Sequence, residues 1–446
     1  MVPERQSAAE LQAAFLRAAT WHGTLDAAEA TLTAHPELWE SGIHVAAVLG
    51  DDVRVRRLLA ENPARATELA DPYGASPLVY LGLSKYLRLD PSRGDAFSRA
   101  ATALLDAGAD ANSGFMTTGE YPERETALYG AAGVAHHAGL TRLLLDRGAD
   151  PNDGEAVYHS PESYDLGALT CLVETGRLTP ESLALMLVRK HDWHDVRGAA
   201  YLLQHGADPN QLRKPWGVRP IHHAVARDNN AGMFEVLLDH GADPTLLQDG
   251  RSAVAMAAHR GRGDLLALFR QRGIRMDLEG ADALLAACAL GDASGVAGIR
   301  RDQPELARQR ATDGGQVLAE FAGNGNTEGV RLLLELGVPA DARFTQGDGY
   351  WDVAPDSTAL HVAAWRAHPD TVKLLIERGA PVNAHDGKGR TPLMLAVKAC
   401  VDSYWSERRT PDSVAALLKA GASTEGVRYP CGYDEVDTLL KASRAG

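Results

Sequence analysis

Residues 357–397 read STALHVAAWRAHPDTVKLLIERGAPVNAHDGKGRTPLMLAV and contain one complete copy of a pattern that returns along the chain. The copy begins with hydroxyl residues that can cap a helix, continues through small alanines, and reaches a second, leucine-rich helix. Gly379 follows that helix, where a left-handed residue lets the chain reverse, and Pro381 and Asn383 are turn residues. The pattern predicts a short helix, a tight turn, a second helix and a glycine-led loop.

The glycine-led phrase recurs about every 28 to 42 residues, when the gap between Gly273 and Gly337 is counted as two units. Its copies are LLDAGADAN, LLLDRGADPN, YLLQHGADPN, VLLDHGADP, LLLELGVPAD, LLIERGAPVN and LLKAGAST, with glycines at 108, 148, 206, 241, 337, 379 and 421. Weaker copies stand at Gly176 and Gly273. Units of this kind bury their apolar faces only against their neighbours, so we expect an all-α repeat solenoid.

This arrangement resembles the ankyrin repeat family, and residues 357–397 are similar to a near-consensus repeat followed by the start of the next. The resemblance implies units of two antiparallel helices joined by a projecting β-hairpin loop, about 11–13 of them, several degenerate. It implies a single array over 1–446. Degenerate capping repeats are expected at 10–73, repeats with insertions at 74–425 and a C-terminal cap at 426–446.

Insertions interrupt the repeat at 85–95, 113–124, 343–357 and 401–413. The insertions at 113–124 and 343–357 are expected in hairpins. Those at 85–95 and 401–413 are expected between the two helices of a unit, at the array edge and away from the binding groove. In the family the groove is formed by hairpin tips and the first helix of each unit, so hairpin insertions mark candidate binding residues.

Large aromatic side chains in loops reduce solubility unless they pack or bind a partner. We therefore expect binding contacts from Tyr350, Trp351, Asp348, Asp352, Phe115, Tyr121, Tyr158, Tyr164 and Trp216. For Trp351 and Trp216 the alternative is that the rings pack against an adjacent hairpin as struts.

Histidines fall into two groups. His44, His222 and His361 occupy the fourth position of the family's T-P-L-H pattern, and the resemblance implies that they brace neighbouring loops. His191 and His194 stand three residues apart in HDWHD, a spacing that on a helix would put both rings on one face. They are weak candidates for two metal ligands, because no third or fourth ligand is visible, and no cofactor is expected.

The formal net charge of −14 makes nucleic acid and anionic membranes unfavourable partners and is compatible with a basic protein. Four separated cysteines without a CxxC pair, an N-terminus without an apolar signal region and the lack of a membrane-length apolar stretch favour a cytoplasmic location. The oligomeric state is not indicated by the sequence.

The sequence contains no GxSxG, GxxxxGK[ST] or HExxH motif. We therefore expect a non-enzymatic scaffold that binds a protein or peptide through its concave groove and hairpin loops. The alternative is an atypical enzyme or small-molecule binder of the same fold, in which the insertion loops enclose a pocket.

Overall fold

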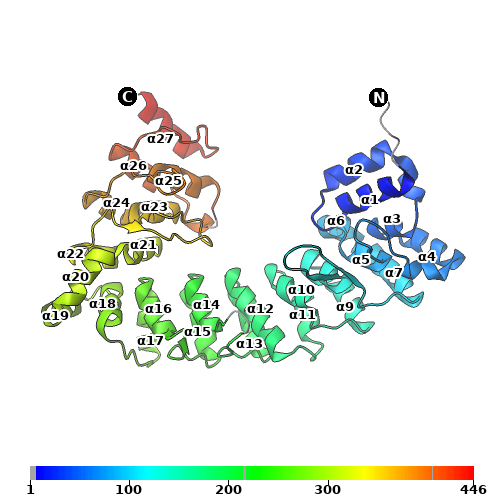
Figure 1. Cartoon of the computed structure of the whole chain (residues 1–446), viewed down its shortest axis with the longest axis horizontal. Helices are drawn as coiled ribbons and strands as arrows, with labels where there is room; N and C mark the ends of the chain where they lie inside the picture. Colours follow the sequence, from blue (N-terminus) through cyan, green and yellow to red (C-terminus); the bar gives the residue numbers. More distant parts are fainter. Residues whose placement is uncertain (1–6, 214–216, 404, 446) are drawn as a thin grey trace. The chain divides into compact units, whose positions relative to one another are not determined.

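The computed structural model describes residues 7–213, 217–403 and 405–445. The chain forms two compact units, Met1–Ala242 (unit 1) and Asp243–Gly446 (unit 2). Both units consist mostly of paired helices connected by loops and short two-stranded hairpins (Figure 1). The paired helices and hairpins are consistent with the expected ankyrin-type array.

Unit 1 contains seven successive helix pairs among its described residues. They are α1 (Ala8–Ala19) with α2 (Leu25–Ala34), α3 (Ile43–Val48) with α4 (Asp52–Glu61), α5 (Pro77–Gly82) with α7 (Gly94–Asp106), α8 (Ala127–Tyr129) and its π-helical continuation η4 (Gly130–Val134) with α9 (Ala138–Asp146), α10 (Gly154–His159) with α11 (Gly167–Val173), α12 (Pro180–Asp192) with α13 (Val196–Gln204), and α14 (Pro220–Ala226) with α15 (Ala231–Asp239). Its hairpin pairs β1 (Gly114–Met116) with β2 (Arg124–Thr126). Short helical turns lie at η1 (Pro36–Glu40), η2 (Pro63–Thr67), α6 (Lys85–Leu89), η3 (Pro91–Arg93) and η5 (Ser160–Glu162).

Unit 2 continues the pattern and ends in a single helix, α27 (Asp434–Ala445). Its pairs are α16 (Ala253–His259) with α17 (Gly263–Gln271), α18 (Gly280–Ala289) with α19 (Ala293–Asp302), α21 (Gly315–Gly323) with α22 (Thr327–Glu335), α23 (Ala359–Trp365) with α24 (Pro369–Glu377), and α25 (Pro392–Val401) with α26 (Asp412–Lys419). Helix α20 (Pro304–Asp313) follows α19, and η6 (Ser406–Arg408) lies between α25 and α26. The hairpins pair β3 (Leu247–Gln248) with β4 (Arg251–Ser252), and β5 (Arg343–Phe344) with β6 (Ser357–Thr358).

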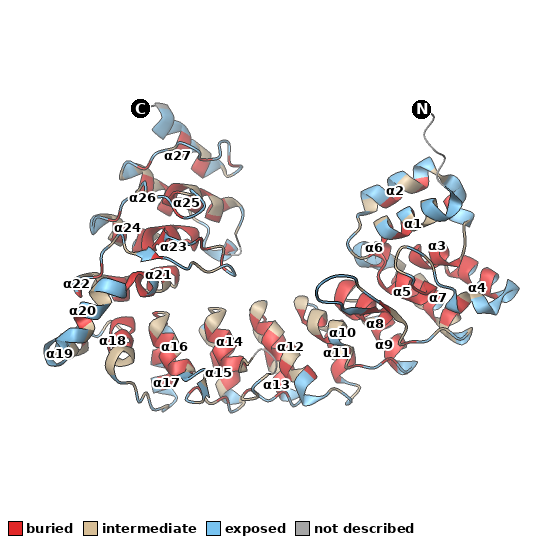
Figure 2. Ribbon diagram, viewed as in Figure 1, coloured by how far each residue is buried: buried red, intermediate tan, exposed pale blue. Residues whose placement is uncertain are grey.

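The core of each unit lies between successive helices, where the buried residues gather (Figure 2). In unit 2 the first helices α21, α23 and α25 pack in order, and α22, α24 and α26 pack beside them. Ala363 and Ala364 of α23 are fully buried, because a methyl side chain lets neighbouring helices approach closely. Each pair therefore buries its apolar face against the pairs before and after it.

Asparagines at the end of the glycine-led phrase join neighbouring loops. The Asn112 side chain donates to the Gly148 carbonyl at 3.0 Å and accepts from the Asp150 N–H at 2.9 Å. Asn383 makes the same pair of bonds with Gly421 and Ser423, at 3.2 and 2.8 Å. Sequence reasoning assigned these asparagines to turns, and the structure adds that they bind the backbone of the next repeat.

The histidines of the T-P-L-H position also bind backbone carbonyls. His361 Nε2 lies 3.0 Å from the Ala384 oxygen and 3.1 Å from the Arg390 oxygen, so this nitrogen carries a proton and donates. His44 Nε2 lies 2.9 Å from the Glu68 oxygen. Burial lowers the pKa of His361 to about 4, which keeps the ring neutral. The bracing contacts expected from the family are therefore present at His44 and His361.

The four insertions fall at identifiable places in the two units. Residues 85–95 contain α6 and η3 between α5 and α7, and residues 401–413 contain η6 between α25 and α26. Residues 113–124 include β1 and lead into β2, and residues 343–357 connect β5 to β6. Among the described parts of the chain, no helix combines the length and apolar character that a membrane span requires.

Candidate functional site at the β5–β6 hairpin

The β5–β6 hairpin is closed at its base by the antiparallel register that pairs Arg343 with Thr358 and Phe344 with Ser357. Its inner turn is held by two backbone hydrogen bonds between Asp348 and Val353, of 2.8 and 2.9 Å. Asp348 Oδ1 also accepts from the Tyr350 N–H at 3.0 Å. The carboxylate of Asp348, one of the expected binding residues, thus helps to shape the turn that presents Tyr350.

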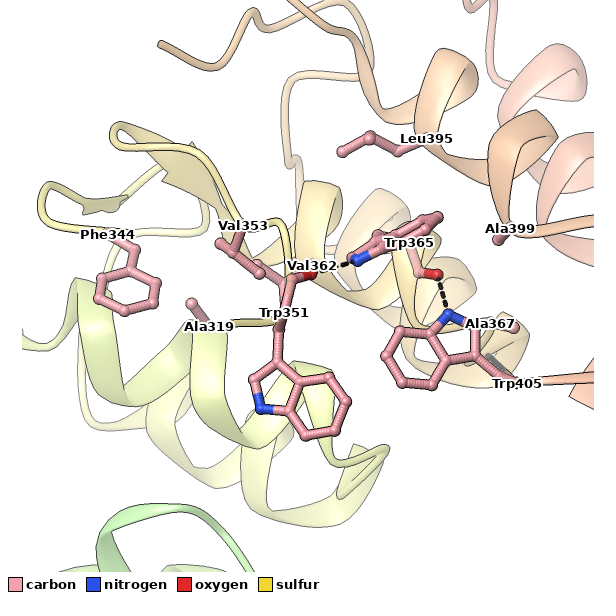
Figure 3. Close-up of a cluster of buried hydrophobic side chains, with 10 residues drawn as sticks. All are labelled: Ala319, Phe344, Trp351, Val353, Val362, Trp365, Ala367, Leu395, Ala399 and Trp405. Atoms are coloured by element: carbon pink, nitrogen blue, oxygen red, sulfur yellow. Dashed lines mark hydrogen bonds between the residues drawn. The ribbon is translucent and has the colours of Figure 1, made fainter. Parts of the chain in front are cut away.

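Trp351, Trp365 and Trp405 form a buried group that we call the tryptophan cluster (Figure 3). Trp365 Nε1 donates to the Trp351 carbonyl at 2.6 Å, and Trp405 Nε1 donates to the Trp365 carbonyl at 2.7 Å. Only 7% of Trp351 is exposed. Trp351 is therefore a packing residue that contacts helix α23 and the 401–413 insertion.

Two cations cover the tryptophan cluster. The Arg366 guanidinium lies 4.7 Å from the Trp351 ring centroid and 5.1 Å from that of Trp405. Lys398 Nζ lies 4.7 Å from the Trp365 ring centroid. At these distances the cations are attracted to the negative faces of the indole rings. The cluster therefore fixes charged side chains as well as the hairpin backbone.

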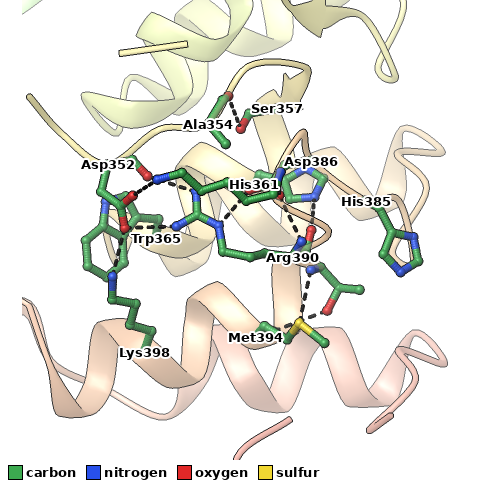
Figure 4. A network of polar contacts seen from close by, with 12 residues as sticks. Asp352, Ala354, Ser357, His361, Trp365, His385, Asp386, Arg390, Met394 and Lys398 are labelled. Atoms are coloured by element: carbon green, nitrogen blue, oxygen red, sulfur yellow. Dashed lines mark hydrogen bonds and ion pairs between the residues drawn. The ribbon is translucent and has the colours of Figure 1, made fainter. Parts of the chain in front are cut away.

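Asp352 is the centre of a polar group that we call the Asp352 network, formed with Lys388, Arg390, Lys398 and Asp386. Figure 4 shows Asp352 with Arg390, Lys398 and Asp386. Lys388, Lys398 and Arg390 donate to the Asp352 carboxylate at 2.7, 2.8 and 2.9 Å. Arg390 also donates to Asp386 at 2.8 Å. The network joins the hairpin to the following loop and to helix α25.

The cations of the network determine the charge state of Asp352. Partial burial would raise the pKa of this carboxyl group, but hydrogen bonds from Lys388 and Lys398, with the charge of Arg390, outweigh it. They hold the pKa of Asp352 well below its usual range. Asp352 was expected to be an acidic contact for a partner, and its negative charge is paired with three cations of unit 2.

Tyr350 is the exposed aromatic residue of the hairpin. Its ring is 44% exposed and meets the Trp351 ring edge to face, with centroids 4.8 Å apart. The side chains of Lys388 and Lys398, at the network beside it, are 57% and 38% exposed. An aromatic ring on a fixed hairpin, with two partly exposed lysine side chains bound to Asp352, is suited to contact another molecule.

A small hollow beside Trp351 is lined by Arg260, Glu320, Asp348 and Arg366, among others. Its volume is about 10 Å³, which is room for about one water molecule. A larger hollow of about 400 Å³ lies between α19 and α22, and it is lined by Val296, Arg300, Leu332 and Glu335 with their neighbours. That second hollow contains no residue of the four insertions.

Four of the other expected binding residues, Phe115, Tyr121, Tyr158 and Tyr164, belong to unit 1. Phe115 is buried and stacks on Tyr73, with centroids 4.8 Å apart. Tyr158 is half-buried beneath the Arg189 guanidinium, whereas 79% of Tyr121 is exposed.

Tyr164 is exposed, and its hydroxyl donates to the Trp193 carbonyl at 2.7 Å. Trp216 lies outside the described residues.

His191 and His194, the weak candidates for metal ligands, lie at the end of a helix and in the turn after it. Helix α12 ends at Asp192, and His194 lies in the following turn with a φ of 52°. His191 is 0% exposed, neither ring nitrogen has a hydrogen-bond partner, and burial lowers its pKa to about 3. The His191 ring is therefore a neutral side chain of the core.

Sequence reasoning missed most partners of the hairpin. Trp405 belongs to the 401–413 insertion, which was expected at the far edge of the array, yet it contacts Trp351 with ring centroids 5.3 Å apart. Arg390 and Lys398 lie 38 and 46 residues after Asp352. Roughly one repeat separates them from the hairpin, so the repeat spacing was the signal that could have suggested the contacts.

Comparison with known proteins supports the assignment of ankyrin repeats to part of unit 2. No curated protein matches the chain. The family model "Ankyrin repeats (3 copies)" matches residues 297–386 and 318–425. These ranges include the β5–β6 hairpin, the tryptophan cluster and the Asp352 network. Residues 297–425 are therefore ankyrin repeats, and the paired helices and short hairpins of the described chain are consistent with an ankyrin repeat array.

Proposed function

We propose that the chain is a non-enzymatic scaffold that binds a protein or peptide through its hairpin loops and first helices, with the β5–β6 hairpin as a principal contact. Ankyrin repeats typically mediate protein binding, and this hairpin lies within the matched repeats. The observation that carries the proposal is the exposed ring of Tyr350, held on a turn whose neighbour Trp351 is buried. A cytoplasmic location, without nucleic acid or membrane as partners, belongs to the same proposal.

Rigidity favours a binding role for Tyr350. Its backbone N–H is bonded to Asp348, and the Trp351 carbonyl is bonded to the Trp365 indole. A side chain that is already positioned loses little conformational freedom when a partner binds, so more of the contact energy remains as affinity. Tyrosine is also among the residues that most often dominate binding energy at interfaces.

The charge around the hairpin suggests the chemistry of the partner at this point. The net charge of the chain is −14 and favours a basic partner overall. The Asp352 network, however, combines three cations with two carboxylates, and Lys388 and Lys398 remain accessible. We therefore propose that the partner places acidic side chains near these lysines and an apolar or aromatic group against Tyr350.

The alternative function, an enzyme or small-molecule binder with an enclosed pocket, would need a cavity beneath the insertion loops. Drug-sized ligands occupy cavities of about 300 to 1,000 Å³. The hollow beside Trp351 has a volume of about 10 Å³ and is partly lined by the Arg260–Glu320 ion pair, whose atoms lie 3.2 Å apart. This difference in size favours recognition on the surface over enclosure at the hairpin.

Affinity capture with the full chain tests the proposal. Wild type, Tyr350→Ala, Lys388→Glu and the control Leu89→Ala would be immobilised and exposed to lysate of the native organism, with quantitative mass spectrometry. Leu89 is an exposed apolar residue in the separate 85–95 insertion. We expect one protein to be retained by wild type and Leu89→Ala and depleted at least tenfold by the other two variants. Equal retention by all four chains would contradict the role of the hairpin.

A further inference from the structure

Three carboxylates of unit 1 lie together at the β1–β2 hairpin. Glu123, Glu125 and Glu155 each place an oxygen within 4.8 Å of the oxygens of the other two. Glu125 lies in β2, and Glu123 comes directly before that strand. Glu155 comes from the first turn of α10 in the next repeat of unit 1. The group therefore spans two successive repeats.

Glu125 is buried without a hydrogen-bond partner for one of its oxygens. The residue is 2% exposed, and its Oε2 atom makes no hydrogen bond. The strand register places Phe115 directly opposite it, so an aromatic ring helps to cover the carboxylate. A buried carboxylate that lacks a partner is strongly disfavoured, and proteins resolve this by protonation or by a bound cation.

The surroundings of Glu125 add further negative charge. Burial, followed by the charges of Glu155 and Glu123, raises the pKa of Glu125 to about 7. His159 contacts Glu155 at 3.3 Å and Glu162 at 3.1 Å, so its positive charge is shared between those two. Over the residues that the structure describes, neither Glu123 nor Glu125 forms an ion pair. The group thus has more negative charge than His159 neutralises.

Hydrogen bonds hold the carboxylate group in place. Glu123 and Thr117 exchange two bonds of 2.8 Å, one to the Glu123 carbonyl and one from its N–H. Asp153 accepts from the Thr126 hydroxyl at 2.6 Å and from the Ala156 N–H at 3.0 Å. Asp153 therefore ties β2 to α10, the two elements that carry the three glutamates. Fixed oxygen atoms bind a metal ion with little reorganisation.

We propose that Glu123, Glu125 and Glu155 form a binding site for a hard divalent cation, and that Ca²⁺ is the preferred ion. Carboxylate oxygens are the ligands that Ca²⁺ prefers, at about 2.3–2.6 Å, so two oxygens on one ion lie at most about 5 Å apart. The 4.8 Å limit on the three oxygens fits that span. A bound ion would give Glu125 a partner and would link the hairpin insertion to the next repeat.

Terbium luminescence with the full chain tests this site. Tb³⁺ replaces Ca²⁺ at oxygen sites and emits when a nearby aromatic ring absorbs light. The Tyr129 ring can sensitise the ion, because its centroid lies 5.3 Å from that of His159, which contacts Glu155 at 3.3 Å. We expect saturable luminescence in wild type that Ca²⁺ displaces, with Mg²⁺ at least tenfold weaker as a competitor.

Two variants and one control make the result specific. Glu125→Gln and Glu123→Gln should each weaken Ca²⁺ binding at least tenfold, measured by calorimetry. Glu120→Gln removes an exposed carboxylate from the same insertion and should bind as wild type does. Circular dichroism would establish that each variant is folded. Absence of saturable Ca²⁺ binding by folded wild type, or equal binding by Glu125→Gln, would overturn the proposal. Neither result bears on the β5–β6 hairpin of unit 2.

Discussion

The indole N–H of Trp365 donates to the carbonyl oxygen of Trp351 at 2.6 Å, so helix α23 holds the hairpin insertion that precedes it in the same repeat. The next insertion is fastened in the same way, because Trp405 donates to the Trp365 carbonyl. Two insertions from successive repeats of unit 2 are thus fixed to the end of helix α23. The hairpin can therefore present Tyr350 in a defined position.

Trp365→Phe should destabilise unit 2. The change leaves the buried carbonyl of Trp351 without its donor, at a cost of about 1–3 kcal/mol. Urea unfolding followed by circular dichroism would measure the loss. Trp39→Phe, at a ring that is half exposed in unit 1, is the control and should change stability little. Equal midpoints for Trp365→Phe and wild type would contradict the role of this bond.

Tyr350→Ala and Trp351→Ala should separate binding from stability, although the residues are adjacent. Truncation of a buried tryptophan costs about 3–5 kcal/mol. The Tyr350→Ala truncation removes one edge-to-face contact with Trp351, at a cost of about 0.5–1.5 kcal/mol. Thermal unfolding would therefore show a large loss for Trp351→Ala and a much smaller one for Tyr350→Ala. A large loss for Tyr350→Ala would mean that its ring is structural.

Asp352→Asn should destabilise the protein near neutral pH and have less effect in acid. The pKa of Asp352 is lowered on folding, so its stabilising contribution is present above the unfolded value of about 4 and is lost as pH falls below it. We expect a loss on the order of 1 kcal/mol at pH 7, because the network is partly exposed to solvent.

Asparagine tolerates the positive φ of 52° at position 352, so the substitution leaves the backbone unstrained. Melting temperatures of the variant and wild type should approach each other as the pH falls from about 5 towards about 1. Asp356→Asn, an exposed residue that also has positive φ, is the matched control. A difference that stays constant over this range would show that the charge of Asp352 is not the cause.

His191→Leu should stabilise the protein in mild acid. The pKa of His191 falls from 6.5 to about 3 on folding, so the native state binds fewer protons than the unfolded state between these values. Wild type therefore loses up to about 1.4 kcal/mol for each pH unit below 6.5, and the leucine variant does not. Differential scanning calorimetry at pH 7 and pH 5 would measure the change.

The matched control for His191→Leu is His205→Leu, which removes an exposed histidine from the next helix end. Its melting temperature should follow wild type at both pH values. If His191→Leu also followed wild type, the ring of His191 would have to accept a proton in the folded state.

The sequence predicted the paired helices, the hairpins and the position of the 343–357 insertion, because these depend on local patterns such as leucine spacing, glycines and prolines. It did not predict that Trp405 contacts Trp351, since this contact depends on how two insertions from successive repeats pack together. Asp352 was named as a binding residue without its cation partners, because Arg390 and Lys398 approach it only after successive repeats stack.

The bonds made by Asn112 and Asn383 have a consequence for how such a chain can change over time. Each side chain contacts only main-chain atoms of the following loop, so the bond forms whatever side chains that loop carries. When a gene gains or loses a whole repeat, the asparagine can therefore form the same hydrogen bonds with the loop of its new neighbour. Array length can vary by duplication and deletion, while exposed positions diverge independently.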